Sequence, residues 1–175
     1  FLMAIDGSKE DENIFSFLNY EPIKEGHMCR HIVCTLPFKA SCDALVKLIE
    51  ENIGCFQNIN KYKLINISGF KPTNKIKDIA DCRQLIRDFE KDGEMTLSFT
   101  VDKMLTGVTV KEWDTILFLK DTASAQEYDQ AIFRIQNPYI QKYQAEGTSD
   151  DTIKRDMKPQ TLLVDLSPER MFRMQ

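Results

Sequence analysis

The stretch TILFL, residues 115–119, is a continuous run of mainly apolar residues without alternation between polar and apolar side chains. A strand of this kind is covered on both faces, which is typical of the parallel sheets of α/β proteins. The run leads into SAQE, residues 124–127, whose Ser-x-x-Glu spacing is the capping box of a helix start. We therefore predict a buried strand followed by a helix that extends toward Pro138.

On either side of this unit, short apolar runs alternate with amphipathic patterns. Strand-length apolar runs occupy residues 31–36, 63–68, 95–101 and 161–166. Apolar residues at helical spacing occupy residues 39–53 and 74–91. Strands that alternate with helices predict right-handed crossovers and therefore an α/β fold, with a mainly parallel sheet between helices in a three-layer α/β/α arrangement. Ligands of such sheets bind beyond the carboxyl ends of the strands.

The composition is that of a globular protein without a global attraction for polyanions. The chain has 175 residues, 42% of them hydrophobic, and this length suits one domain. Its net charge of −4 means that any polyanion must be bound locally. The odd number of cysteines, 5, favours a reduced, cytoplasmic protein over a disulfide framework. No apolar run approaches the roughly 18 residues of a membrane span, so we expect no membrane partner.

Two stretches carry candidate phosphate chemistry. Gln130, Arg134 and Asn137 share one polar face of the helix expected after residue 124, and a guanidinium beside an amide suits a phosphate group. A solvated helix face would give the same pattern. Residues 100–110 break from a strand into a hydroxyl-rich loop with one glycine, which could hold phosphate oxygens or could simply be a connection.

A third pattern, His27-x-Cys29-x-His31-x-x-Cys34, contains the residue types of a zinc site. It runs into an expected strand, whose alternation would place Cys34 on the face opposite Cys29 and His31. We therefore expect no metal site and interpret the cysteines as small buried side chains. The chain also contains no Gly-x-x-x-x-Gly-Lys-Ser/Thr loop, the amide cradle and lysine that hold ATP phosphates.

Several of these segments together resemble a known family. In chain order, residues 31–41, 100–110, 114–119 and 124–134 resemble motifs of the second RecA-like domain of superfamily 2 helicases, and in particular the motor domains of type I and type III restriction enzymes. The run TVDKMLTGVTVKEWDTILFLKDTASAQEYDQAIFRIQN looks like motif V, a buried strand and motif VI in the family's order.

The resemblance implies a domain organisation. Residues 31–170 would be a RecA-like helicase C-terminal domain, within which residues 141–159 are a polar excursion. Residues 1–30 would be part of the connection from a first RecA-like domain. We therefore expect the chain, which begins at Phe1, to be a piece of a longer protein.

The resemblance also implies site residues. Arg134 and Gln130 match the arginine and glutamine of motif VI, which act at the nucleotide phosphates as catalytic residues. The motif V loop implies nucleotide contacts from Thr106, Gly107 and Thr109. Turns at strand ends imply contacts with the nucleic-acid backbone from Pro37, Ser41, Ser68, Gly69 and Thr100. Contacts of this kind make affinity sensitive to salt and read little base sequence.

For the full-length parent, the resemblance implies ATP and Mg²⁺ as cofactors. The implied partners are duplex DNA through its phosphate backbone, the first RecA-like domain of the same chain, and methyltransferase or specificity subunits. We expect neither cofactor to be bound by this fragment alone, because the phosphate-binding loop is absent.

Two departures from the family pattern keep a second reading open. The second motif VI arginine is Asn137 here, and Thr109 stands where many relatives have an aspartate in motif V. An arginine finger strongly accelerates phosphoryl transfer, so that role would pass to Arg134 or to an arginine outside this chain. A non-catalytic helicase-like scaffold or nucleic-acid-binding module would have the same fold. A free-standing doubly wound domain for a small ligand is a third reading, for which no glycine-rich fingerprint occurs.

Overall fold

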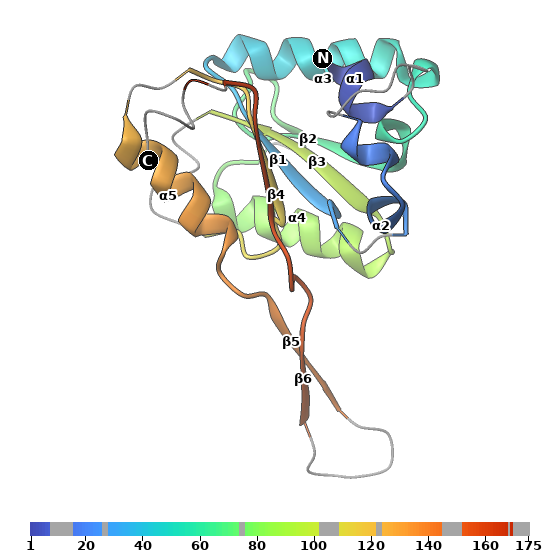
Figure 1. The fold of residues 1–175 in the computed structure, drawn as a ribbon, viewed down its shortest axis with the longest axis vertical. Coiled ribbons are helices and arrows are strands. Elements are labelled where there is room, and N and C mark those ends of the chain that lie inside the picture. The colour runs from blue at the N-terminus through green and yellow to red at the C-terminus, as the bar shows by residue number, and fades with distance from the viewer. Residues whose placement is uncertain are drawn as a thin grey trace.

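The computed structural model of the chain describes residues 1–7, 16–25, 28–73, 76–101, 109–121, 124–144, 152–167 and 169. Within these residues, five strands form a parallel sheet in the order β2-β3-β1-β4-β7 (Figure 1). The strands are β1 (His31–Thr35), β2 (Tyr62–Asn66), β3 (Met95–Thr100), β4 (Thr115–Phe118) and β7 (Leu162–Asp165). Each of them lies within or beside a run that the sequence predicted to be a strand.

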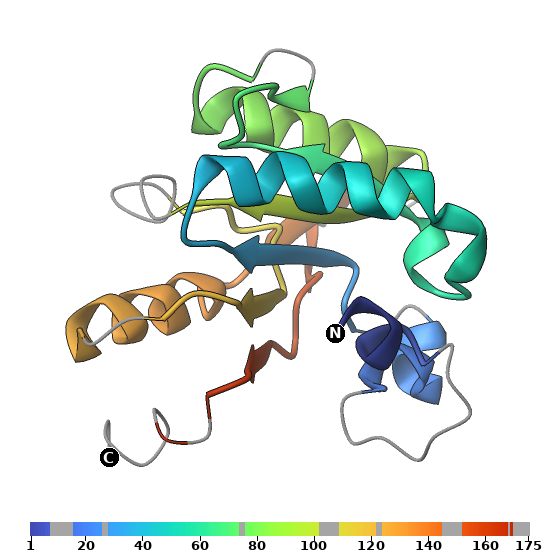
Figure 2. The ribbon, with the colours of Figure 1, turned by 90° about the horizontal axis from the view of Figure 1, so that it is seen from above.

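Helices cover both faces of this sheet (Figures 1 and 2). On one face, α3 (Lys39–Glu51) packs through Cys42 and Ile49 into a cluster that includes Ile32 of β1. On the other face, α4 (Ile79–Lys91) and α5 (Ala125–Ile135) pack into a cluster that includes Val33 of β1 and Ile116 of β4. Successive side chains of β1 thus point to opposite faces of the sheet and pack into two separate cores. The predicted α/β fold with three layers is confirmed.

The N-terminal residues pack on the α3 side of the sheet. They form α1 (Leu2–Asp6), the 3-10 turn η1 (Phe17–Asn19) and α2 (Glu21–Lys24). Their buried apolar residues, Leu2, Ile5, Leu18 and Ile23, belong to the same cluster as α3. The carboxylate of Asp6 is fully buried and accepts hydrogen bonds from the backbone N–H groups of Gln57 and Asn58 at 2.8 and 2.9 Å. This attaches the segment to the two short turns η2 (Ile53–Cys55) and η3 (Ile59–Lys61) that precede β2.

Two parts of the secondary structure differ from the predictions. The helix predicted from residue 74 begins at Ile79, because the Asp78 side chain accepts the N–H of Asp81 at 2.9 Å and caps the helix there. The predicted polar excursion contains two antiparallel strands, β5 (Ile140–Gln144) and β6 (Thr152–Asp156), which form a hairpin that projects from the body (Figure 1). Both faces of the hairpin carry polar residues, so its sequence shows no apolar periodicity that would predict strands.

The parallel sheet has two chemically different edges. We call the edge where the strands end the carboxyl edge, and the edge where they begin the amino edge. α5 follows β4, so it starts near the carboxyl edge and runs back toward the amino edge, where the hairpin of β5 and β6 leaves the body (Figure 1). No helix in the described part of the chain is long and apolar enough to cross a membrane.

Candidate nucleic-acid interface

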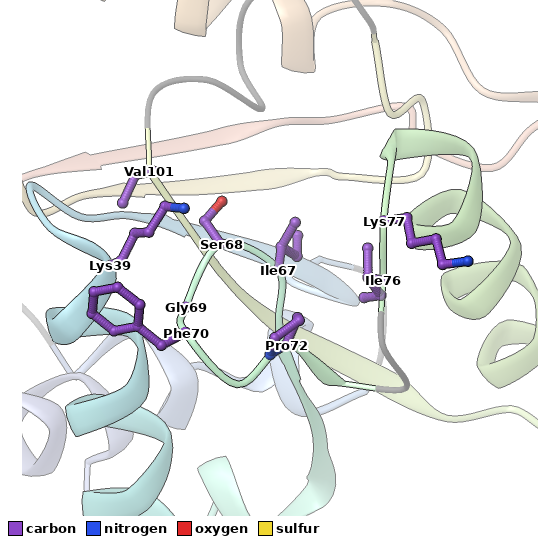
Figure 3. Close-up of a pocket in the computed structure, with 9 residues that line it drawn as sticks. All are labelled: Lys39, Ile67, Ser68, Gly69, Phe70, Pro72, Ile76, Lys77 and Val101. Carbon is purple, nitrogen blue, oxygen red and sulfur yellow. The ribbon is translucent and has the colours of Figure 1, made fainter.

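A cavity of about 450 Å³ opens at the carboxyl edge, beyond the ends of β2 and β3 (Figure 3). Its walls come from the turn after β2, the start of α3, the residues before α4 and the end of β3. The lining residues are Lys39, Ile67, Ser68, Gly69, Phe70, Pro72, Ile76, Lys77 and Val101. This is the position at which ligands bind in open α/β sheets.

The five residues predicted to contact nucleic acid all lie at this edge. Ser68 and Gly69 line the cavity itself. The hydroxyl oxygens of Ser68 and Thr100 are 2.8 Å apart, which ties the turn after β2 to the end of β3. Pro37 is exposed beside the start of α3, and Ser41 is half-buried in its first turn. The parallel sheet therefore brings the five together, and their role in binding stays a prediction.

The turn after β2 is held in place by two side chains, Asp43 of α3 and Asn66. Asp43 accepts the N–H of Phe70 at 2.9 Å and the Asn66 amide at 2.7 Å. Asn66 in turn accepts the N–H of Gly69 at 2.8 Å. Burial alone would raise the pKa of Asp43, but these hydrogen bonds and a further one from the N–H of Lys71 outweigh it and lower that pKa. The turn is thus preorganised around an ionised carboxylate.

Gly69 is required in this turn by space rather than by its backbone angles. A Cβ at this position would overlap with the carboxylate of Asp43 and with the amide of Asn66. Both side chains are fixed by the hydrogen bonds just described, so neither can move aside without losing a bond. The absence of a side chain at residue 69 is therefore part of how the cavity wall is built.

Two lysines border the cavity, and sequence reasoning missed both. Lys39 is the first residue of α3, where the helix dipole already presents a partial positive charge and Phe38 at the N-cap makes no capping side-chain bond. Lys77 precedes α4, whose first turn is capped by Asp78 and by the bond from the Lys77 N–H to Asp81 at 3.0 Å. Positive charge therefore collects at the start of α3. A lysine at the unfavourable end of a helix is the sequence signal that could have revealed it.

The residues matched to motif VI lie on α5, away from this cavity. Arg134 is in the last turn of α5 and is half-buried, which lowers the pKa of its guanidinium, and Gln130 is exposed one turn earlier. α5 has 11 residues and spans about 16 Å from the carboxyl edge toward the amino edge. Arg134 is thus at the end of α5 remote from the carboxyl edge, on a different surface from the lysines.

Asn137, at the position of the second motif VI arginine, has a local structural partner. Its side-chain amide donates to the carbonyl oxygens of Phe133 and Arg134 at 3.2 and 3.3 Å. These carbonyls are among the last of α5, which no further helical N–H can satisfy. Asn137 therefore caps the carboxyl end of α5.

The motif V loop is described only in part. Thr106 and Gly107 lie outside the described residues, so the structure does not place them. Thr109 is half-buried, and the next residue, Val110, packs in the cluster that α4 and α5 share. The described end of this loop is thus on the same face of the sheet as Arg134.

Of the cysteine and histidine pattern near β1, His27 lies outside the described residues, and Cys29, His31 and Cys34 are buried. His31 faces α4, with its Nδ1 3.0 Å from the Thr96 hydroxyl and its Nε2 3.9 Å from Glu90, whereas Cys34 lies in the cluster on the α3 side. The prediction that Cys29 shares the face of His31 is wrong. Cys29 also belongs to the α3-side cluster, because its positive φ of 54° turns the chain before the strand begins. Burial raises the pKa of the Cys29 thiol to about 12, and among the described residues no three His, Cys, Asp or Glu side chains gather as a metal would require.

Two known proteins are similar to this chain, one in structure and one in sequence. The structure resembles the crystal structure of the C-terminal part of the Fun30 ATPase domain, with a TM-score of 0.52 and 13% sequence identity over 91% of this chain. The chain has the fold of a helicase-like C-terminal domain. In sequence, 111 residues are 40% identical to the C-terminus of a putative type II restriction enzyme and methyltransferase from Mycoplasma pneumoniae, a match that covers 63% of this chain. No family model matches the chain.

The chain corresponds to only part of each of these proteins. It spans 42% of the Fun30 chain and 15% of the mycoplasma protein. The predicted RecA-like helicase C-terminal fold is confirmed by the structural match. Similarity to a restriction system is supported by the sequence match, while the specific closeness to type I and type III enzymes stays a prediction.

Proposed function

We propose that this chain is the second RecA-like domain of an ATP-dependent DNA helicase or translocase of restriction-enzyme type, and that its carboxyl edge binds the phosphate backbone of DNA. The helicase-like fold and the restriction-enzyme relative support the general class. The observation that carries the DNA contact is the cavity at the carboxyl edge, which combines Lys39, Lys77 and Ser68 with the start of α3.

These groups have the chemistry of a phosphate site. The first backbone N–H groups of α3, the ammonium group of Lys39 and the hydroxyl of Ser68 are all able to donate hydrogen bonds to phosphate oxygens. An anion here would also relieve the repulsion between Lys39 and the positive end of the α3 dipole. The chain is acidic as a whole, so this local cationic site would supply its attraction for DNA.

The nucleotide half of the motor would use a different surface. ATP and Mg²⁺ would be held mainly by the phosphate-binding loop of a first RecA-like domain, in the cleft between the two domains. Arg134 and Gln130 on α5, with Thr106, Gly107 and Thr109, would face that cleft. The half-buried guanidinium of Arg134 suits this task, since its planar fork of donors matches phosphate oxygens and α5 carries it away from the DNA cavity.

Measuring DNA-stimulated ATP hydrolysis by the full-length protein tests the nucleotide half. Arg134→Ala should lower turnover by about a thousandfold, as the loss of an arginine finger does. Arg155→Ala is the matched control, because Arg155 is exposed on β6, and it should leave turnover unchanged. Undiminished hydrolysis by the Arg134 variant would remove this residue from the mechanism.

DNA affinity, measured over a series of salt concentrations, tests the carboxyl edge. Lys39→Ala should weaken binding to every sequence alike and reduce the salt slope by about one. Lys47→Ala on the same helix is the control, because Lys47 is exposed and paired with Glu51 at 3.6 Å, outside the cavity lining. Equal behaviour of the two variants would contradict the proposed backbone site.

A second candidate function is a helicase-like scaffold that binds nucleic acid without hydrolysing ATP. Asn137 favours it, because this residue caps α5 where the family carries its second arginine. The two candidates differ in the rest of the protein. A phosphate-binding loop and an Asp-Glu pair upstream of these residues, together with DNA-stimulated hydrolysis, would support the motor, and DNA binding without hydrolysis would support the scaffold.

A further inference from the structure

The cavity at the carboxyl edge is more apolar than a phosphate site requires. Beside Lys39, Lys77 and Ser68, its walls are built from the apolar side chains Ile67, Phe70, Pro72, Ile76 and Val101 (Figure 3). Its volume of about 450 Å³ falls within the range of pockets for small organic groups, roughly 300–1,000 Å³. A backbone phosphate would use only the cationic rim and would leave the apolar walls without a partner.

Phe70 is the most unusual of these wall residues. Its side chain is 72% exposed, although burial of a phenylalanine side chain normally stabilises a fold by about 1.5–3 kcal/mol. The backbone around it is not loose, because the N–H groups of Gly69 and Phe70 are bound by Asn66 and Asp43. The ring is therefore presented to solvent from a fixed turn, so little conformational entropy is lost when a ligand stacks on it.

A nucleotide has the two kinds of surface that this cavity offers. Its base is a flat aromatic group that stacks on aromatic side chains whatever its identity, and its phosphate is an anion that pairs with ammonium groups. Lys39 and Phe70 both line the cavity, so a base and its phosphate could be held together there (Figure 3). Bases inside an intact duplex are stacked on their neighbours and cannot reach such a ring.

We infer that this cavity holds one unpaired nucleotide of a DNA strand, with its base stacked on Phe70 and its phosphate at Lys39. The inference rests on the proposed function and narrows its substrate class from duplex backbone to a strand with a base out of the stack. Lys77 plays the smaller part in phosphate binding, because Asp78 and Asp81 lie beside it at the start of α4.

Phe38 provides a matched control on the same side of the molecule. It is 69% exposed, nearly as much as Phe70, and it stands directly before Lys39 at the N-cap of α3. It does not belong to the cavity lining. Any effect of general hydrophobicity at this edge should appear equally with Phe38, whereas stacking in the cavity should appear with Phe70 alone.

The test uses the full-length protein without ATP and a single strand that carries the fluorescent base aminopurine, with the matching duplex as the second probe. Phe70→Ala should weaken single-strand binding about tenfold and abolish the quenching of aminopurine that stacking causes, while duplex binding stays the same. Phe70→Trp should restore both signals, and Phe38→Ala should change neither. Because the hydrogen bonds at residue 70 use its backbone, the Phe70 variants should keep the thermal midpoint of the unchanged protein.

The outcomes separate this inference from the proposed function. If Phe70→Ala binds the single strand as well as before, or weakens duplex binding equally, the unpaired-nucleotide site is overturned, while a loss with Lys39→Ala still supports the backbone site. If Lys39→Ala changes neither probe, the proposed backbone site itself fails. Displacement of the strand by an equal concentration of thymidine monophosphate would overturn the assignment to a DNA strand in favour of a free nucleotide.

Discussion

The carboxyl and amino edges of the sheet differ in where their polar groups find partners. At the carboxyl edge, Lys39, Lys77 and Phe70 face an open cavity. At the amino edge, the buried or half-buried charged residues Glu90, Glu112 and Lys158 are paired with other side chains or with the backbone. Buried polar groups must find partners within the fold, so those of the amino edge are explained by stability. The exposed groups of the carboxyl edge have no such explanation, and this difference favours the carboxyl edge as the proposed binding surface.

Two buried charges, Glu112 and Lys158, lie at the amino edge. Glu112 is 1% exposed and receives the guanidinium of Arg87 at 2.6 Å and that of Arg83 at 3.5 Å. Lys158, after the hairpin, donates to the carbonyl oxygens of Lys111 and Trp113 at 2.9 and 3.0 Å, and its burial lowers the pKa of its ammonium group. These bonds connect α4, the start of β4 and the base of the hairpin.

A second cluster attaches the hairpin to α4. The Tyr139 hydroxyl donates to Glu90 at 2.7 Å, and burial together with this bond raises the pKa of Tyr139 to about 12. Burial would raise the pKa of Glu90 as well, but neighbouring His31 and the Tyr139 hydroxyl outweigh it and lower that pKa. An ionised Glu90 is thus a fixed acceptor at the point where the hairpin leaves the body.

The largest expected effect tests whether the amino edge is purely structural. Arg87→Ala removes the close partner of Glu112 and should lower the free energy of unfolding by about 3 kcal/mol, the low end for breaking a buried ion pair, because Arg83 remains. Urea denaturation measures it. Arg83→Ala, which removes the longer contact, should cost less. DNA affinity of the folded Arg87 variant should be unchanged, and a selective loss of affinity would contradict the division between the edges.

The next effect tests the preorganised turn of the carboxyl edge. Gly69→Ala places a Cβ against Asp43 and Asn66, so the turn must shift, and overpacking of this kind costs about 2 kcal/mol. Thermal unfolding measures the cost, and single-strand affinity should fall as well because Phe70 moves with the turn. Gly54→Ala is the control, since no atom lies within 4 Å of a Cβ there. If both glycine variants behave alike, the close approach at Gly69 does not constrain the turn.

The sequence predicted the fold well because apolar runs report burial on both faces of a strand. TILFL at residues 115–119 became the buried strand β4, and the runs elsewhere became the rest of the parallel sheet. The hairpin was missed because neither of its strands has a continuous apolar face. The start of α4 was placed too early because the apolar stripe continued past the capping residue Asp78.

The candidate site was predicted only in outline. Ser68, Gly69 and Thr100, which the resemblance implied as nucleic-acid contacts, lie at one edge because the ends of parallel strands converge, and their role in binding stays a prediction. Lys39 and Phe70 were missed because single exposed lysines and phenylalanines are common on protein surfaces. Only their position around one cavity, on a turn fixed by Asp43, distinguishes them, and that depends on contacts between α3 and the end of β2.

The contributions of Asp43 at the carboxyl edge and Asp114 at the amino edge to stability should change with pH in opposite directions. The folded-state pKa of Asp43 is lowered below 3.8, so its contribution to stability is complete above pH 3.8 and is lost as the pH falls through the folded value. At the amino edge, burial raises the pKa of Asp114 above 3.8, although His31, Thr115 and the backbone of Arg30 oppose it. Its contribution is complete below pH 3.8 and is lost as the pH rises through the folded value.

Paired Asp→Asn variants measure this difference. Asp43→Asn should destabilise the protein by about 1 kcal/mol near neutral pH, with a smaller deficit in acid, because it weakens hydrogen bonds to an ionised group. The free energy of unfolding of the Asp114→Asn variant should increase relative to that of the unchanged protein as the pH rises, since the substitution removes a buried charge. Urea midpoints between pH 3 and 7 provide the data. If the difference in stability from the unchanged protein changes with pH in the same direction for both variants, the opposite pKa shifts of Asp43 and Asp114 are contradicted.

The smallest effect concerns the hairpin, where Lys142 of β5 lies directly opposite Lys154 of β6. Like charges across a two-stranded ribbon repel each other, and both side chains are exposed, so the cost is small. Lys154→Glu should stabilise the hairpin by about 0.5 kcal/mol by creating an opposite-charge pair, which hydrogen exchange of the β5 and β6 amides can resolve. Lys63→Glu on β2 would lose the contact with Glu94 at 3.3 Å, so this variant should lower the stability instead of raising it. Because the hairpin leaves from the amino edge, Lys154→Glu should leave single-strand affinity unchanged, and a loss of affinity would show that the ligand surface reaches beyond the carboxyl edge.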